Sequence, residues 1–204
     1  MRSLMRWFKR RVGRASGQSM VEFLVILPIL LIMISGLVEF GFLLNYYLDL
    51  IDGARDGARF GANVDPLLRD DERQDCINTT YFYRLIPCVV TQSLAPQIVL
   101  SATDDIVISS FAVASGVVTA RFPDADGWSL TGFHVSEFTT AEINAMLDPA
   151  APNTGMVLVE VFYDYNMVMA LPWITAFVPN PVVLHAYTIM PNTHVEPTPT
   201  PSSP

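Results

Sequence analysis

The chain has 204 residues, of which 51% are hydrophobic, and a formal net charge of -8, so it has room for one membrane segment and one modest domain. Six of the 12 Lys and Arg residues lie in the first 14 positions, whereas the chain from residue 45 onward carries 18 acidic residues against six arginines. A basic N-terminus, an apolar run after it and an acidic remainder of the chain indicate a membrane protein. They argue against a nucleic-acid binder, which needs a basic surface to neutralise phosphates.

Residues 1–17 form a basic leader, and residues 18–62 are predicted to form one long helix that is apolar at first and amphipathic later. The apolar run from Met20 to Leu44 is long enough to cross a bilayer, which takes about 20 residues. Its basic flank favours a cytoplasmic N-terminus, so the domain after it is expected outside the membrane. The run is too long for an ordinary cleaved secretory signal and lacks a clear cleavage site near its end.

Two acidic residues accompany this run. Glu22 stands near its start, where a carboxylate in lipid costs about 3 kcal/mol on insertion scales. Either a partner relieves that cost, or the side chain reaches the headgroups and needs none. Glu39 has no clear partner in the sequence, so we expect it at the outer headgroups and assign it no role in assembly.

A stripe of small residues follows in the amphipathic part of the predicted helix. Gly53, Gly57 and Gly61 are each four residues apart, so they share one helix face. Because glycine costs a helix about 1 kcal/mol relative to alanine, three in register call for a reason. The stripe allows close helix packing, either between subunits or within the chain's own domain.

Residues 63–190 are predicted to form an α+β extracytoplasmic domain, in which the long helix lies against a small antiparallel sheet. Residues 63–96 carry no clear pattern. Strands are expected at residues 97–102, 105–114, 116–122, 156–165 and 182–190, a capping-box helix at 139–147 and a short helix at 171–178. The Pro-, Thr- and Ser-rich tail, residues 191–204, is expected to be disordered.

Two cysteines, Cys76 and Cys88, lie in this outer domain. An even number in an oxidising compartment favours a disulfide between them, and two buried free thiols are the alternative. Metal binding is disfavoured, because no CxxC pair or nearby histidine completes a ligand set.

Motifs for catalysis are lacking. His134, His185 and His194 are scattered, and no hydrolase, metalloprotease, phosphate-binding or dinucleotide-binding motif occurs. Asp124 to Gly127 has only the beginning of a calcium loop. We therefore expect neither an enzyme nor a bound metal or cofactor.

Four sequence features together resemble the N-terminal region of the TadE-like family, minor pilins or pseudopilins of tight-adherence (Flp-type) pili. The resemblance covers about residues 17–62. The features are the Gly-x-x-x-x-Glu-Phe start at Gly17, the Leu27-Pro28 step, Val38-Glu39-Phe40-Gly41 and Ala54-Arg55-Asp56-Gly57-Ala58-Arg59.

The resemblance implies cleavage by a prepilin peptidase on the cytoplasmic side, between Gly17 and Gln18. Glu22 would then be the fifth residue of the mature chain, the position typical of this class. Cleavage removes the basic leader and frees an α-amino group, with which Glu22 of a neighbouring subunit can pair to set the register of assembly.

The sequence thus predicts a structural pilin or pseudopilin of a tight-adherence (type IVc) pilus in the bacterial inner membrane. It would pass through the membrane once and enter a homo- or hetero-polymer. The implied partners are the prepilin peptidase, other pilins and an inner-membrane assembly platform. The alternative is a single-pass anchored extracytoplasmic binding domain that is never processed.

Overall fold

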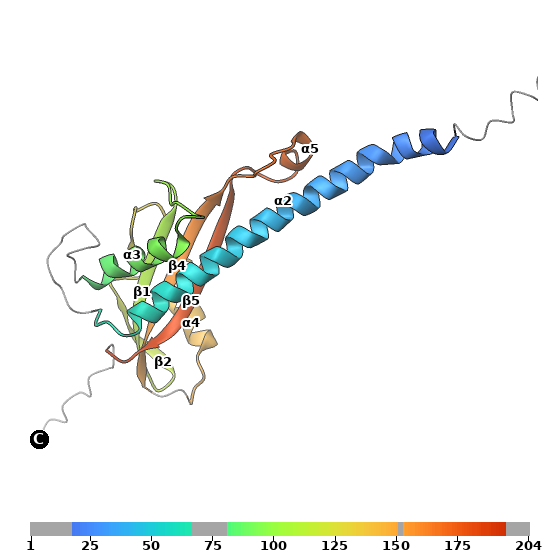
Figure 1. Ribbon diagram of the computed structural model, residues 1–204. Coiled ribbons are helices and arrows are strands. Elements are labelled where there is room, and N and C mark those ends of the chain that lie inside the picture. The colour runs from blue at the N-terminus through green and yellow to red at the C-terminus, as the bar shows by residue number, and fades with distance from the viewer. Residues whose placement is uncertain (1–17, 67–80, 151–152, 195–204) are drawn as a thin grey trace, which may run out of the picture.

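The computed structural model describes residues 18–66, 81–150 and 153–194. It begins with a 44-residue helix, α2 (Gln18–Gly61), which is followed by α3 (Phe82–Leu94). An antiparallel sheet with two short helices completes the fold (Figure 1). The predicted α+β class is confirmed. The leader and residues 195–204 of the predicted tail lie outside the described residues.

The sheet is fully antiparallel, with the order β2-β1-β4-β5 and with β3 pairing with β1. Its strands are β1 (Asp105–Ala114), β2 (Val117–Phe122), β3 (Trp128–Ser129), β4 (Thr154–Tyr165) and β5 (Val182–Asn192). Helix α4 (Thr140–Met146) lies between β3 and β4, and α5 (Pro172–Thr175) between β4 and β5.

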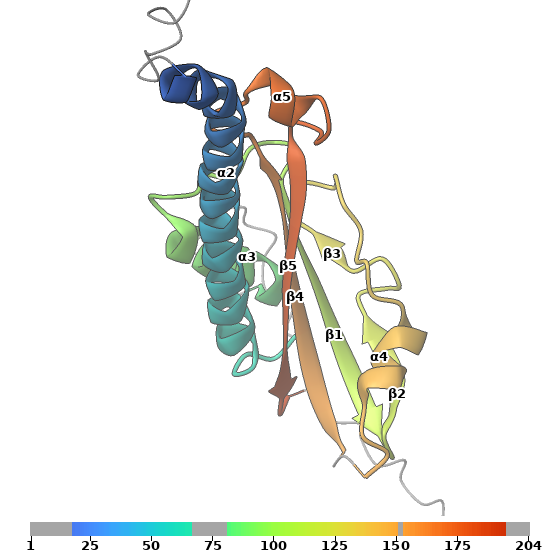
Figure 2. The ribbon, with the colours of Figure 1, turned by 90° about the vertical axis from the view of Figure 1, so that its right-hand side faces the viewer.

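Different parts of the chain cover the two faces of the sheet. Val157, Val159 and Val161 of β4 belong to the main core together with side chains of α2 and α3. Leu158, between them, packs with Phe111 and Ile143 in a smaller core beside α4. This alternation is the two-residue period of a strand. Figure 2 accordingly shows α2 and α3 on one side of the sheet and α4 on the other.

Most of the predicted elements of the outer domain are present. Thr139 and Glu142 form the expected capping box of α4, and β4 lies inside the sheet as its alternating sequence predicted. The strand expected at residues 97–102 is wrong: this stretch is a connection, in which Ile98 enters the core. Helix α3 was not predicted, although it buries Phe82, Ile86, Val90 and Leu94 at a four-residue spacing.

The glycine stripe faces α3 and the sheet of its own chain. A Cβ atom on Gly53 would lie 2.7 Å from Leu94 Cδ2, and one on Gly61 2.7 Å from Ile86 Cδ1. A Cβ on Gly57 would overlap Val90 Cγ2. Of the two alternatives left open by the sequence, the structure has the packing within the chain, and the glycines let two helices approach closely.

We predict that Gly57→Ala lowers the free energy of unfolding by about 1–3 kcal/mol, the usual cost of overpacking. The β-branched side chain of Val90 has little rotamer freedom in a helix, and Ile86 Cγ2 and Val159 Cγ1 close the site at 3.3 and 3.5 Å. Chemical unfolding of the full chain in detergent micelles, followed by near-UV circular dichroism, measures this.

Gly41→Ala is the matched control for this substitution. No atom lies within 4 Å of a Cβ built at Gly41, which is in the same helix. This variant should be as stable as the parent or more so, since alanine favours a helix by about 1 kcal/mol. Equal stabilities for the two variants would contradict the packing described.

A buried carboxylate organises the segment after β3. Asp105, at the start of β1, is fully buried and accepts six hydrogen bonds. The donors are Ser129 Oγ and the backbone N–H groups of Ile106, Leu130, Thr131, Phe133 and His134. Burial alone would raise the pKa of Asp105, but these hydrogen bonds hold it below the ordinary 3.8.

We predict that Asp105→Asn costs roughly 3 kcal/mol at neutral pH, because an amide has one acceptor oxygen and turns an N–H group toward donors. A lowered folded-state pKa contributes stability above the unfolded pKa of 3.8 and loses it as pH falls through the folded value. The parent should therefore lose more stability than the variant on acidification below about pH 4.

Asp52→Asn controls for removal of a charge. Asp52 makes an exposed ion pair with Arg55 (Oδ1–Nη1, 3.1 Å), and such pairs contribute about 0–1 kcal/mol. Urea titrations at several pH values compare the two variants. Equal pH dependence of Asp105→Asn and the parent would contradict the role assigned to Asp105.

Candidate functional site

The N-terminal half of α2 is an exposed apolar rod. Every residue from Ser19 to Ile34 is exposed except Leu27, which is half-buried. Large apolar side chains dominate, among them Met33 (70% exposed) and Leu37 (71% exposed). The helix includes an 18-residue window with a mean hydropathy of 2.7, of which 6% is buried. It is therefore compatible with single-pass membrane anchoring.

The sequence-predicted assembly residues lie at the start of this rod. Gln18 is the first residue of α2, and Glu22 is exposed just over one turn later. Gly17 lies outside the described residues. Cleavage between Gly17 and Gln18 and the register role of Glu22 therefore stay predictions.

The junction between the apolar rod and the sheet domain depends on Glu39. Its side chain is 4% exposed and accepts hydrogen bonds at both carboxylate oxygens. Tyr165 Oη donates to Oε1 at 2.7 Å, and the backbone N–H groups of Val168 and Met169 donate to Oε1 and Oε2 at 2.9 and 2.8 Å. A charge beside lipid is tolerated when it is satisfied in this way.

One turn nearer the N-terminus, Ser35 makes a second contact with the same segment. Its hydroxyl donates to the carbonyl of Ile32 at 2.8 Å and accepts from Trp173 Nε1 at 3.0 Å. At the Glu39 contact, burial and the hydrogen bond to the carboxylate raise the pKa of Tyr165. The tyrosine hydroxyl therefore remains a donor at physiological pH. The connection between β4 and β5 is thus fixed to α2 at two successive turns.

The expectation that Glu39 has no clear partner is wrong. It is buried, and the residues that satisfy it lie at least 126 positions away in the sequence. Local pattern gives no signal for such a contact. The one available sign was the presence of a carboxylate within an apolar run.

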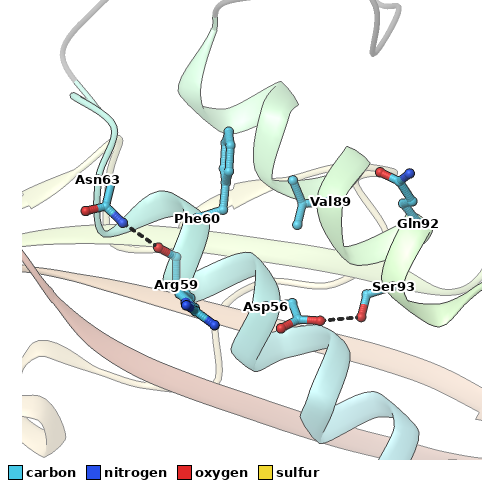
Figure 3. Close-up of a pocket in the computed structure, with 7 residues that line it drawn as sticks. All are labelled: Asp56, Arg59, Phe60, Asn63, Val89, Gln92 and Ser93. Atoms are coloured by element: carbon cyan, nitrogen blue, oxygen red, sulfur yellow. Dashed lines mark hydrogen bonds between the residues drawn. The ribbon is translucent and has the colours of Figure 1, made fainter.

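Two other residues of the sequence analysis, Asp56 and Cys88, can be placed in the structure. Asp56 accepts a hydrogen bond from Ser93 Oγ at 2.6 Å, and this pair borders a groove of about 460 Å³ between α2 and α3 (Figure 3). Its remaining lining residues are Arg59, Phe60, Asn63, Val89 and Gln92. Cys88 lies half-buried on α3, whereas Cys76 lies outside the described residues, so the disulfide stays a prediction.

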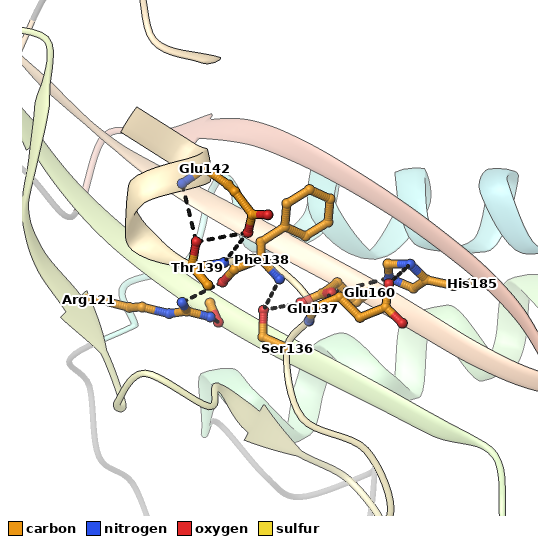
Figure 4. A network of polar contacts seen from close by, with 9 residues as sticks. Arg121, Ser136, Glu137, Phe138, Thr139, Glu142, Glu160 and His185 are labelled. Carbon is orange, nitrogen blue, oxygen red and sulfur yellow. Dashed lines mark hydrogen bonds and ion pairs between the residues drawn. The ribbon is translucent and has the colours of Figure 1, made fainter. Parts of the chain in front are cut away.

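A serine, a histidine and two glutamates meet on the opposite face of the sheet (Figure 4). Ser136 Oγ donates to the buried carboxylate of Glu160 at 2.5 Å, and His185 Nε2 lies 3.2 Å from its other oxygen. His185 Nδ1 is 3.0 Å from Glu137 Oε2. The hydroxyl hydrogen bonds to a carboxylate and not to the imidazole, so this is not the serine–histidine pair of a hydrolase.

In the part of the chain that the structure describes, no group of three or more His, Cys, Asp or Glu residues is arranged to hold a metal ion. His134 and His185 instead stack on Phe162, with ring centroids 4.4 and 4.5 Å apart. Both histidines therefore pack beside the sheet.

We predict that Glu39→Ala lowers the free energy of unfolding by about 3 kcal/mol, because it leaves the buried Tyr165 hydroxyl and two backbone N–H groups without an acceptor. The segment after β4 should also become sensitive to proteolysis, since two of those donors belong to it. Unfolding in detergent micelles and limited proteolysis measure the two effects.

Glu22→Ala is the matched control, because it removes the same charge from an exposed position of the same helix. It should leave stability and proteolysis at the parent's level. A Glu39→Ala chain that also behaved like the parent would contradict the anchoring role of Glu39.

Comparison with known proteins gives one match. Residues 17–59 match the sequence model of a family described as TadE-like protein. No curated protein and no solved structure matches the chain. The matched stretch contains the exposed apolar rod, Glu22, Glu39 and two glycines of the stripe. Residues 17–59 are thus similar to the TadE-like family, and the exposed apolar helix within them is compatible with single-pass membrane anchoring.

Proposed function

We propose that this protein is a pilin or pseudopilin of a tight-adherence (type IVc) pilus. In this proposal it is held in the bacterial inner membrane by α2, with the sheet domain outside. A prepilin peptidase cuts between Gly17 and Gln18. The observation that carries the proposal is an exposed apolar half-helix of the TadE-like type, continuous with a half that is packed into a folded domain.

Assembly would move the apolar rod from lipid into a bundle of like helices. Large exposed side chains such as Phe23, Ile29 and Leu37 suit both surroundings, because lipid tails and neighbouring helices are equally apolar. Since α2 runs unbroken into the core, a displacement of the rod moves the sheet domain with it. The subunit is therefore suited to insertion as a rigid unit.

Glu22 would set the register between subunits. In the proposed mature chain its carboxylate pairs with the α-amino group of a neighbour's Gln18, four residues from its own position. A slipped subunit would leave both charges unpaired in an apolar bundle, which costs several kcal/mol. Other pilins and an inner-membrane assembly platform are the partners that this mechanism requires.

Glu22→Ala tests the register role. We expect membrane insertion at the parent's level and a loss of incorporation into pili of about tenfold or more, corresponding to at least 1.4 kcal/mol per subunit contact. Sheared pili and membranes are compared by quantitative immunoblot. Glu22→Asp retains the charge and should recover part of the incorporation.

Normal incorporation of Glu22→Ala would contradict the register role. A parent chain that is never found in pili, in cells that assemble them, would instead favour the anchored binding domain. The two results are distinct, because only the second argues against a role of this protein in a pilus.

A further inference from the structure

We propose that the segment between β4 and β5, residues 166–181, is a second membrane contact, which inserts apolar side chains into the outer leaflet beside α2. The inference rests on the proposed membrane anchoring through α2. It adds a lipid-binding surface on the sheet domain, formed far from the anchoring helix in sequence.

The composition of the segment is unlike that of the domain around it. Residues 166–184 contain no Asp, Glu, Lys or Arg, although the chain from residue 45 onward carries 18 acids and six arginines. Its apolar side chains are turned outward: Phe177 is 88% exposed and Val168 57%. Met169, Trp173 and Val178 are exposed as well. An apolar patch of this kind marks a surface that contacts something other than water.

The segment is held beside the apolar rod. Glu39 fixes its start through Val168 and Met169, and Ser35 fixes Trp173, one turn or about 6 Å closer to the N-terminus of α2. In Figures 1 and 2 α5 accordingly lies alongside α2, beyond the ends of the strands. The segment thus extends from the sheet toward the membrane end of the molecule.

The depth agrees with an interfacial position. At 1.5 Å per residue, about 20 residues of α2 from Gln18 span the roughly 30 Å hydrocarbon core, which would then end near Val38. Ser35 and Glu39 lie on either side of that point. Trp173 would lie at the headgroup level, where tryptophan is enriched because its ring is apolar and its N–H is polar.

Most of the segment's backbone N–H groups, eight of thirteen, are satisfied within the protein. Pro172, Pro179 and Pro181 have no N–H to satisfy. The eight donors are Met167, Val168, Met169, Ile174, Thr175, Ala176, Phe177 and Val178. Satisfied donors are what lipid requires of a backbone, whereas a loop in water has no such need.

Lipid is favoured over another protein because the patch continues an existing apolar belt. Leu37, Val38 and Phe40 are exposed on α2 at the level of Ser35 and Glu39, next to the segment. The helix and the segment together present apolar side chains at one depth. A bilayer matches a belt of that form without a complementary partner surface.

Quenching of Trp173 fluorescence by brominated lipids tests the proposal. The full chain carrying Trp7→Phe and Trp128→Phe is reconstituted in phosphatidylethanolamine–phosphatidylglycerol vesicles, one set brominated near the headgroup end of the acyl chains and a second set near their tail end, which reports residues deep in the bilayer. A chain that retains only Trp128 is the comparison, because β3 pairs with β1 at the level of Val159, about 20 Å along β4 from Tyr165.

We expect quenching of Trp173 to be about twofold greater than that of Trp128, as for a residue at the interface. Phe177→Asp should reduce that quenching by placing a charge in the apolar patch. Val99→Asp is its matched control, because Val99 is 79% exposed outside the segment, and it should have no effect.

A third single-tryptophan chain, with Leu30→Trp in α2, reports the anchoring helix itself. If Leu30→Trp is quenched and Trp173 is not, the segment does not touch lipid and the inference is overturned, while the proposed anchoring stands. If Trp173 escapes quenching because a second copy of the chain covers the segment, the inference is likewise overturned. Without quenching at Leu30→Trp, the anchoring and the inference both fail.

Discussion

The close packing of the second half of α2 against α3 is the constraint on which the rest of the structure depends. Gly53, Gly57 and Gly61 bring Leu94, Val90 and Ile86 into direct contact with the helix backbone. The same helix is packed into a folded core at one end and exposes apolar side chains at the other. Because it runs unbroken between them, the glycines fix the position of the sheet domain relative to Glu22.

The change from the exposed apolar half of α2 to the half packed against the sheet domain begins at Ser35 and Glu39. Both are buried polar groups in a stretch of exposed apolar ones, and both are satisfied by residues after β4. An apolar residue at position 39 would leave Tyr165 Oη and two backbone N–H groups unsatisfied. The carboxylate thus joins the rod, the sheet and the segment containing α5.

Sequence periodicity was sufficient for the helix, the α+β class and the main strands, because these depend on local pattern and length. Helix α3 escaped prediction despite its four-residue apolar spacing, because Pro87 lies inside it and proline usually breaks a helix. The stretch at 97–102 is rich in β-branched residues but makes a core connection. The roles of Glu39 and Asp105 could not be predicted, since their partners lie as far as 130 and 29 residues away in the sequence. Such contacts exist only once the sheet has formed.

The most direct test of the account is the intact mass and N-terminal sequence of the protein isolated from its native membrane or pilus fraction. The proposed function predicts a mature chain that begins at Gln18 and lacks the basic leader. Its free amino terminus would then lie four residues from Glu22, as the register mechanism requires. A chain that begins at Met1, in cells with an active prepilin peptidase, would contradict processing and leave α2 as a permanent anchor.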